Sequence, residues 1–254
     1  MENLGHIALL LAAAFTAGAL NAVAGGGSFL TLPALVFTGV PPVVANATGT
    51  VALLPGYAAS AWGFREDMKA PPGLSMLQVV LLSLVGGSAG AALLLFTPDA
   101  TFRKVVPWLL LAATAMFAFG PQLRQWATGK NTAGQPPSTV KAAFGMLAVA
   151  IYGGYFNGGL GILLLALFGL LGQTQLNAMN GMKNLVSALL TTIAVAIYAA
   201  GGIVQWEQAL MMMVAATAGG YGGARVARKI PPHILRWGIV ATGLVMAALF
   251  FAKG

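Results

Sequence analysis

The sequence predicts an all-α integral membrane protein made of two inverted repeats, with about 8–10 transmembrane segments and broken or half helices after glycine motifs. Three observations lead to this fold class: an apolar composition, the spacing of the apolar runs and an internal repeat. Of the 254 residues, 58% are hydrophobic and only 7% are charged, and the mean hydropathy is +0.84. These values lie far from those of soluble globular proteins and indicate a chain that contacts lipid along much of its length.

The apolar runs, and the breaks between them, define the expected helices. A full helical crossing takes about 20 residues, so the second and seventh runs are too short for a regular span and are expected to be half-helices. Pro-Pro pairs at 41, 71, 136 and 231 fall between runs, where proline ends a helix without opening its hydrogen-bond ladder inside lipid. The ten runs are 4–24, 28–40, 46–64, 74–96, 105–120, 141–157, 160–172, 182–200, 208–226 and 234–252.

The positions of Lys and Arg indicate how many runs cross the membrane. If all ten cross, nine of these residues lie on one side and three on the other, which is a clear positive-inside bias. If the two short runs turn back within the membrane, the positive residues divide nearly evenly. We therefore favour ten crossings with both termini in the periplasm, the first run being a retained span because Glu2, and no Lys or Arg, precedes it. The nine are Arg65, Lys69, Arg124, Lys130, Lys141, Arg225, Arg228, Lys229 and Arg236, and the three are Arg103, Lys104 and Lys253.

An internal repeat relates the two halves of the chain. At an offset of 133 positions a glycine-rich run followed by Pro and Arg aligns with a second such run, and at 134 one glycine break aligns with another. Five crossings in each half, an odd number, would invert the second copy relative to the first. We expect a first repeat over residues 1–121, a polar linker over 122–138 and a second repeat over 139–254. The aligned sets are Gly86, Gly87, Gly90, Ala91, Pro98 and Arg103 with Gly219, Gly220, Gly223, Ala224, Pro231 and Arg236, and Gly25, Gly27, Leu30 and Asn46 with Gly159, Gly161, Leu164 and Asn180.

Two glycine breaks form the expected binding site. Residues 24–28 and 157–161 weaken the helix and expose backbone polar groups, which a bilayer tolerates only where the backbone is buried in protein or lines a cavity. A half-helix that starts after each break would present N–H groups and its positive dipole end to a bound anion. Neutral polar groups nearby could hold that anion without a full buried countercharge: Ser28, Thr31, Asn46, Thr48, Thr50, Asn157, Asn180 and Asn184.

Lys183 is the one charge placed inside an apolar segment. A lysine at the centre of a membrane helix costs about 2.5–3.5 kcal/mol on insertion scales, so it needs a functional or geometric reason. We expect Lys183 to face the cavity and attract the substrate. The alternative is that its side chain extends from a segment end to the membrane surface, since a short stretch of helix separates it from the preceding loop.

Two other patterns are interpreted as packing or anchoring features. The glycine-rich runs 86–90 and 219–223 are expected to let helices approach closely rather than contact a ligand. Trp62, Trp108, Trp206 and Trp237 lie near segment ends, where an indole would meet the membrane interface, although tryptophan also packs in cores.

The number and positions of the Cys, His, acidic and basic residues argue against a metal site, an intramembrane enzyme and a nucleic-acid-binding protein. The chain has no cysteine, and His6 and His233 are too far apart for a local metal motif, so no metal and no cofactor are expected. All five acidic residues fall at segment ends or in loops, which argues against an intramembrane enzyme. The net charge of +8 comes from bases in short loops, so lipid headgroups, and not nucleic acid, are the expected partner.

Two pairs of motifs resemble the Sulfite exporter TauE/SafE family. The first-repeat signature is GALNAVAGGGSFLTLP at residues 18–33 followed by ANATGT at 45–50. Its second-repeat counterpart is YGGYFNGGLG at 152–161 followed by LNAMNGMKN at 176–184. The resemblance covers essentially the whole chain, including its length and its two-fold layout.

The resemblance implies a transporter of sulfur-containing anions, such as sulfite, sulfonates or other organosulfur acids, in a bacterial inner membrane. The alternative is a passive anion channel, or a permease for a different small organic anion. Expected partners are a small anionic substrate and the lipid bilayer, and a homodimer is left open. The substrate-binding residues expected from the breaks and from the resemblance are Asn21, Gly25, Gly26, Gly27, Ser28, Asn46, Thr48, Thr50, Asn157, Gly159, Gly161, Asn180, Lys183 and Asn184.

Overall fold

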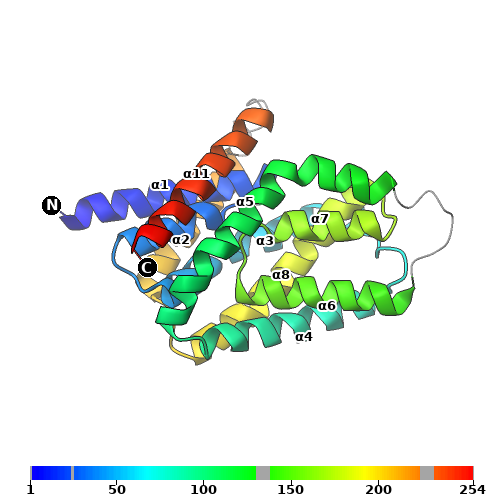
Figure 1. Cartoon of the computed structure of the whole chain (residues 1–254), viewed down its shortest axis with the longest axis horizontal. Helices are drawn as coiled ribbons and strands as arrows, with labels where there is room; N and C mark the ends of the chain where they lie inside the picture. The colour runs from blue at the N-terminus through cyan, green and yellow to red at the C-terminus, as the bar shows by residue number, and fades with distance from the viewer. Residues whose placement is uncertain (1, 24–25, 130–137, 224–231, 254) are drawn as a thin grey trace.

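A computed structural model describes residues 2–23, 26–129, 138–223 and 232–253 of the chain. Every element in these ranges is a helix, as Figure 1 shows. The first half contains five helices, α1 (Glu2–Val23), α2 (Ser28–Phe37), α3 (Pro42–Gly63), α4 (Met76–Leu95) and α5 (Asp99–Gly129). The second half contains α6 (Thr139–Tyr155), α7 (Leu160–Leu170), α8 (Leu176–Ala200), α9 (Trp206–Ala218), a π-helical turn η1 (Gly219–Gly223) and α11 (Pro232–Lys253).

These bounds follow from local chemistry at the helix ends. Pro42 and Pro232 are the first residues of their helices, where the missing N–H of proline costs no hydrogen bond. Ser75 caps α4 through a reciprocal capping box with Gln78. Each of the ten apolar runs expected from the sequence overlaps a described helix, while residue 24 of the first run and residues 224–226 of the ninth lie outside the described residues.

Two helices extend by six or more residues beyond the apolar runs that predicted them. α5 continues to Gly129, so residues 122–129 of the expected linker are helical. α8 starts at Leu176, six residues before the run expected at 182–200. In both cases polar residues ended the apolar run without ending the helix, because polarity alone does not break the backbone hydrogen-bond ladder.

Glycines allow two pairs of helical elements, α4 with α6 and η1 with α1, to pack at very short distance. A Cβ atom on Gly86 would lie 2.5 Å from the Cβ of Ala150 on α6, and one on Gly90 would collide with the carbonyl oxygen of Ile151. Gly219 would likewise collide with the carbonyl of Phe15 on α1. This is the packing role expected from the sequence for these glycines, although Gly220 also lines a cavity described below.

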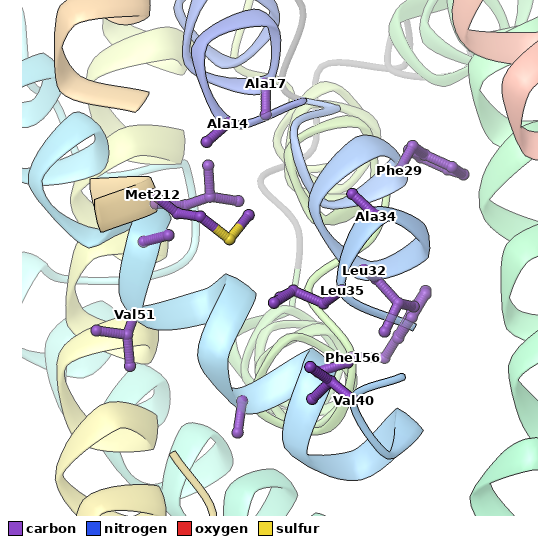
Figure 2. Packing of buried hydrophobic residues seen from close by; sticks show 14 of the residues in the cluster. Ala14, Ala17, Phe29, Leu32, Ala34, Leu35, Val40, Val51, Phe156 and Met212 are labelled. Atoms are coloured by element: carbon purple, nitrogen blue, oxygen red, sulfur yellow. The ribbon is translucent and has the colours of Figure 1, made fainter. Parts of the chain in front are cut away.

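Buried side chains form two adjoining clusters. The larger one joins α1, α2, α3 and α9 to α5 and α11, and the smaller one joins α4, α6, α7 and α8. In Figure 2, Met212 of α9 reaches toward Leu35 of α2, with Ala14 and Ala17 of α1 nearby. α3 and α8 contact each other between the two groups of helices.

Three helical stretches are long and apolar enough to cross a membrane, namely Leu4–Asn21, Met76–Leu95 and Leu176–Ala200, counting only described residues. The four tryptophans expected at the membrane interface, Trp62, Trp108, Trp206 and Trp237, are all exposed. The alternative that they pack in the core is therefore wrong. Their side chains instead lie on the outer surface of the helix bundle, where a membrane would surround them.

Candidate functional site

The first glycine break folds back onto the helix that precedes it. The backbone N–H of Gly27 donates a hydrogen bond of 2.8 Å to Oδ1 of Asn21 on α1. A Cβ on Gly27 would lie 2.9 Å from both the carbonyl oxygen of Ala17 and Nδ2 of Asn21, so only glycine fits here without a shift. Asn21 therefore fixes the path of the chain between α1 and α2.

The second glycine break uses a left-handed residue. Gly159 has a φ of 74° directly before α7, a backbone conformation that favours glycine. The hydroxyl of Tyr152 donates a hydrogen bond of 2.6 Å to the carbonyl of Gly158, and buried Phe156 lies within the same connection. The break is thus held by side chains of α6 and of the connection itself.

At the start of the short helix after each break, one backbone N–H group has no acceptor among the described residues. The N–H groups of Phe29 and Leu30 donate to the carbonyls of Gly26 and Gly27, and that of Ile162 donates to Gly159. Among the described residues, the N–H groups of Ser28 and Gly161 form no hydrogen bond. The expected anion-binding donors are therefore fewer than a bare helix end would supply.

α3 connects the two breaks. Nδ2 of Asn46 donates a hydrogen bond of 3.2 Å to the carbonyl of Tyr155, the last residue of α6. Further along α3, the hydroxyl of Tyr57 lies 3.5 Å from Oδ1 of Asn157 and donates to it. Because these side chains are spaced by helical turns, one face of α3 meets the second break at two points.

A cavity of about 270 Å³ lies where α1, α3 and the end of α9 meet. Asn21 and Tyr57 line it, together with Ser60 of α3 and Thr217 of α9. Tyr57 is buried, whereas Tyr221 at the edge is 75% exposed, so the cavity opens at the surface. Nδ2 of Asn21 is buried and has no hydrogen-bond partner in the described part of the chain. Among the described residues that line the cavity, a solute would meet hydroxyl and amide groups beside apolar side chains such as Leu53 and Ala216, and no charged group.

The remaining expected site residues occupy other places. Oγ1 of Thr48 accepts a hydrogen bond of 3.1 Å from the backbone N–H of Gln205, directly before α9, which is a structural role. Oγ1 of Thr50 donates 2.7 Å to the carbonyl of Asn46 within α3. The carbonyl of Gly26 accepts from Phe29, as stated above, and Gly25 lies outside the described residues.

Three expected site residues, Asn180, Lys183 and Asn184, lie in the first turns of α8 and do not line the 270 Å³ cavity. Lys183 is only 5% exposed and makes no hydrogen bond or ion pair within the described ranges. A buried amine without a partner is costly, so an anion beside it would be strongly favoured. The assignment of Lys183 to the substrate stays a prediction.

Sequence reasoning missed Tyr57, Ser60 and Thr217. A signal existed for Tyr57, because it follows Asn46 and Thr50 at helical spacing on α3. Thr217 comes from α9, in the other half of the chain, and only the packing of α9 beside α1 and α3 brings it to the cavity.

Comparison with known proteins gives consistent matches along the chain. The protein family described as Sulfite exporter TauE/SafE matches residues 10–250. A "Probable membrane transporter protein" of Haemophilus influenzae is 30% identical, over 95% of this chain and 93% of the relative. A "Probable membrane transporter protein ORF9" of Sinorhizobium sp is 26% identical, over 97% and 92%, and "Probable membrane transporter protein YfcA" of Escherichia coli K12 is 24% identical, over 95% and 88%. No solved structure matches the chain.

Proposed function

The chain belongs to the Sulfite exporter TauE/SafE family, and from this premise we propose that it is a carrier for sulfur-containing anions such as sulfite or small sulfonates. It is an integral membrane protein of a transporter family, as its apolar helices and its relatives indicate. In this proposal the substrate binds near the midplane between two inverted repeats. The positive-inside bias of the loops supports a bacterial inner membrane with both termini in the periplasm.

The order and packing of the helices support the inverted repeat. Within the described residues, five α-helices in the first half, α1 to α5, are followed by five in the second, and a short helix comes second in each set. α4 packs along α6 and also contacts α8, while α9 packs along α1 and also contacts α3. These two contacts between the halves therefore have counterparts in which the halves exchange roles, as two copies related by a two-fold axis require.

The observation that carries the proposed site is the unpaired amide of Asn21 in a cavity beside Tyr57. Nδ2 of Asn21 is buried and has no partner among the described residues, and a buried donor left unpaired costs about 1–3 kcal/mol. A substrate oxygen could accept a hydrogen bond from this amide, and the hydroxyl of Tyr57, which lines the same cavity, could donate to the substrate in place of its bond to Asn157. Tyr57 also contacts Asn157, so the substrate would touch residues that join both glycine breaks.

The chemistry of this lining suits a singly charged oxyanion. A sulfonate or hydrogen sulfite spreads one negative charge over several oxygens, each of which accepts hydrogen bonds. Neutral donors can replace the water around such an ion, whereas a dianion would need a countercharge. Lys183, buried on α8, is the charged group within the membrane region that could attract the anion before or during its passage.

The test is exchange of labelled substrate in liposomes. Purified protein would be reconstituted in vesicles loaded with labelled sulfite or ethanesulfonate, and efflux would be followed against a series of external anions. The proposal predicts saturable exchange that external sulfur oxyanions accelerate and that acetate or chloride does not. A matched Asn21→Ala variant should lose this exchange, whereas Lys141→Ala, an exposed residue at the start of α6, should keep it.

Two results would contradict the proposal in different ways. Flux that rises linearly with concentration and needs no counter-anion would indicate a passive channel. Saturable exchange of carboxylates without any exchange of sulfur anions would keep the carrier mechanism and overturn the substrate class.

A further inference from the structure

A groove on the outer surface of the bundle shares no lining residue with the proposed transport cavity. It consists of two adjoining cavities, of about 420 Å³ and 70 Å³, that share Pro33 and Phe37 of α2 and Met246 of α11. We name it the α2–α11 groove. Its larger part also contacts α1, and its smaller part ends at Arg103 in α5.

The groove exists because α11 packs only loosely on α2. The repeat counterpart of this contact is the one between α5 and α7. There, α5 packs on α7 much more extensively than α11 packs on α2. The space that this leaves beside α2 is bordered by apolar side chains. Phe37 and Leu249 at its edge are exposed, at 70% and 46%, so in a membrane they would face lipid tails.

Arg103 gives one end of the groove a positive charge. It lies in the second turn of α5, is half-buried, and forms no ion pair with any described residue. Asp99, one turn earlier on α5, accepts a hydrogen bond of 3.1 Å from the backbone N–H of Val43 instead. A planar guanidinium with free donors is well suited to a phosphate group.

The groove runs from Arg103 along α11, toward the N-terminal end of that helix. Leu249 lines the part next to Arg103, and Thr242 lines the far part, one α11 turn after another. At a rise of about 1.5 Å per residue, these positions are roughly 10 Å apart along α11. One leaflet of hydrocarbon is about 15 Å thick, so an acyl chain that entered beside Arg103 could follow the groove over most of a leaflet.

We propose that the α2–α11 groove binds an anionic phospholipid, with the phosphate on Arg103 and one acyl chain between α2 and α11. The apolar walls fit a hydrocarbon chain, and Arg103, the one cation among the described lining residues, fits one phosphate. A soluble phosphate would use only Arg103 and leave the apolar length of the groove unexplained. The bound lipid would support α2, the short helix that begins at the first glycine break.

The test is to count the lipids that remain bound after purification. Native mass spectrometry would be applied to protein from vesicles of phosphatidylglycerol and phosphatidylcholine in equal parts. The proposal predicts preferential retention of phosphatidylglycerol, and Arg103→Gln should lower its affinity about fivefold, the ~1 kcal/mol that one basic residue contributes near a membrane surface. Lys104→Gln is the matched control, because this neighbouring side chain is exposed and does not line the groove.

A second variant tests the apolar part. Met246→Trp would fill the groove where its two cavities meet, and it should also lower lipid retention while Arg103 is kept. Equal retention of both lipids by the unaltered protein would overturn the proposal. So would an equal loss in Arg103→Gln and Lys104→Gln, since that would mean general surface charge and no built site. Neither result would affect the anion-exchange assay, so the two proposals fail independently.

Discussion

Nδ2 of Asn46 donates a hydrogen bond to the carbonyl oxygen of Tyr155 across 3.2 Å, although 109 residues of sequence separate them. This bond joins α3 of the first half to the last residue of α6 in the second. Tyr155 directly precedes the second glycine break, so the position of that break depends on a side chain from the other half. A movement of α6 and its break away from α3 would have to open this contact.

Replacement of Asn46 by Ala should therefore destabilise the fold. The carbonyl of Tyr155 would lose its partner in a partly buried place, and we expect the free energy of unfolding to fall by about 1 kcal/mol or more. Thermal unfolding in detergent would measure it. Asn180→Ala is the control, because Asn180 is the repeat counterpart of Asn46. Its side chain is half-buried and makes no hydrogen bond within the described ranges. An equal loss in both variants would contradict this account.

Two substitutions of Asn21 should separate its structural role from its role in binding. Asn21→Ala removes the acceptor for the N–H of Gly27 and should lower both stability and transport. Asn21→Asp keeps an acceptor for Gly27 but replaces the unpaired amide by a negative charge in the cavity. We expect this variant to fold while anion exchange is strongly reduced. Normal exchange by Asn21→Asp would remove Asn21 from the substrate site.

Lys183→Ala should weaken the apparent affinity for the anion about tenfold or more, since a hydrogen bond to a charged group contributes about 1.5 kcal/mol or more. The half-saturation concentration for sulfonate exchange would report it. Lys183→Arg keeps the charge and should recover part of the affinity. If Lys183→Ala leaves both rate and affinity unchanged, the buried lysine has no part in substrate binding.

Gly90→Ala should disrupt the contact between α4 and α6. Its methyl group would collide with the carbonyl of Ile151 and approach the N–H of Tyr155. Overpacking of this kind costs about 1–3 kcal/mol, and here the obstacle is backbone that cannot rotate away. Gly5→Ala serves as control, because nothing lies within 4 Å of the new methyl group. A melting temperature for Gly90→Ala equal to that of the unaltered protein would show that the helices can separate without cost.

The helices themselves were largely predictable, because apolar runs and their proline and glycine borders are local features. The start of α8 was not, since Asn177 and Asn180 make its first turns polar although Ala178 and Met179 are buried. Packing against other helices, which no local pattern records, extends the helix there.

The candidate site was only partly predictable for the same reason. Asn21, Gly27, Asn46 and Asn157 follow from motifs at the glycine breaks. The sequence gives no reason to place Thr48 against the start of α9, or Thr217 in the cavity, because both depend on how α9 packs between α1 and α3. Long-range packing of this kind becomes visible only in three dimensions.

The proposed function requires that a sulfur anion occupies the cavity lined by Asn21, Tyr57 and Ser60. The chain has no cysteine, so Ser60→Cys introduces a single thiol at that cavity, and Ser138→Cys places one at an exposed position before α6 as a control. The decisive measurement is the rate at which a maleimide modifies each thiol, with and without saturating ethanesulfonate. We expect ethanesulfonate to slow modification of Ser60→Cys alone, and modification there to stop exchange. An unchanged rate at Ser60→Cys, with exchange intact after modification, would contradict it.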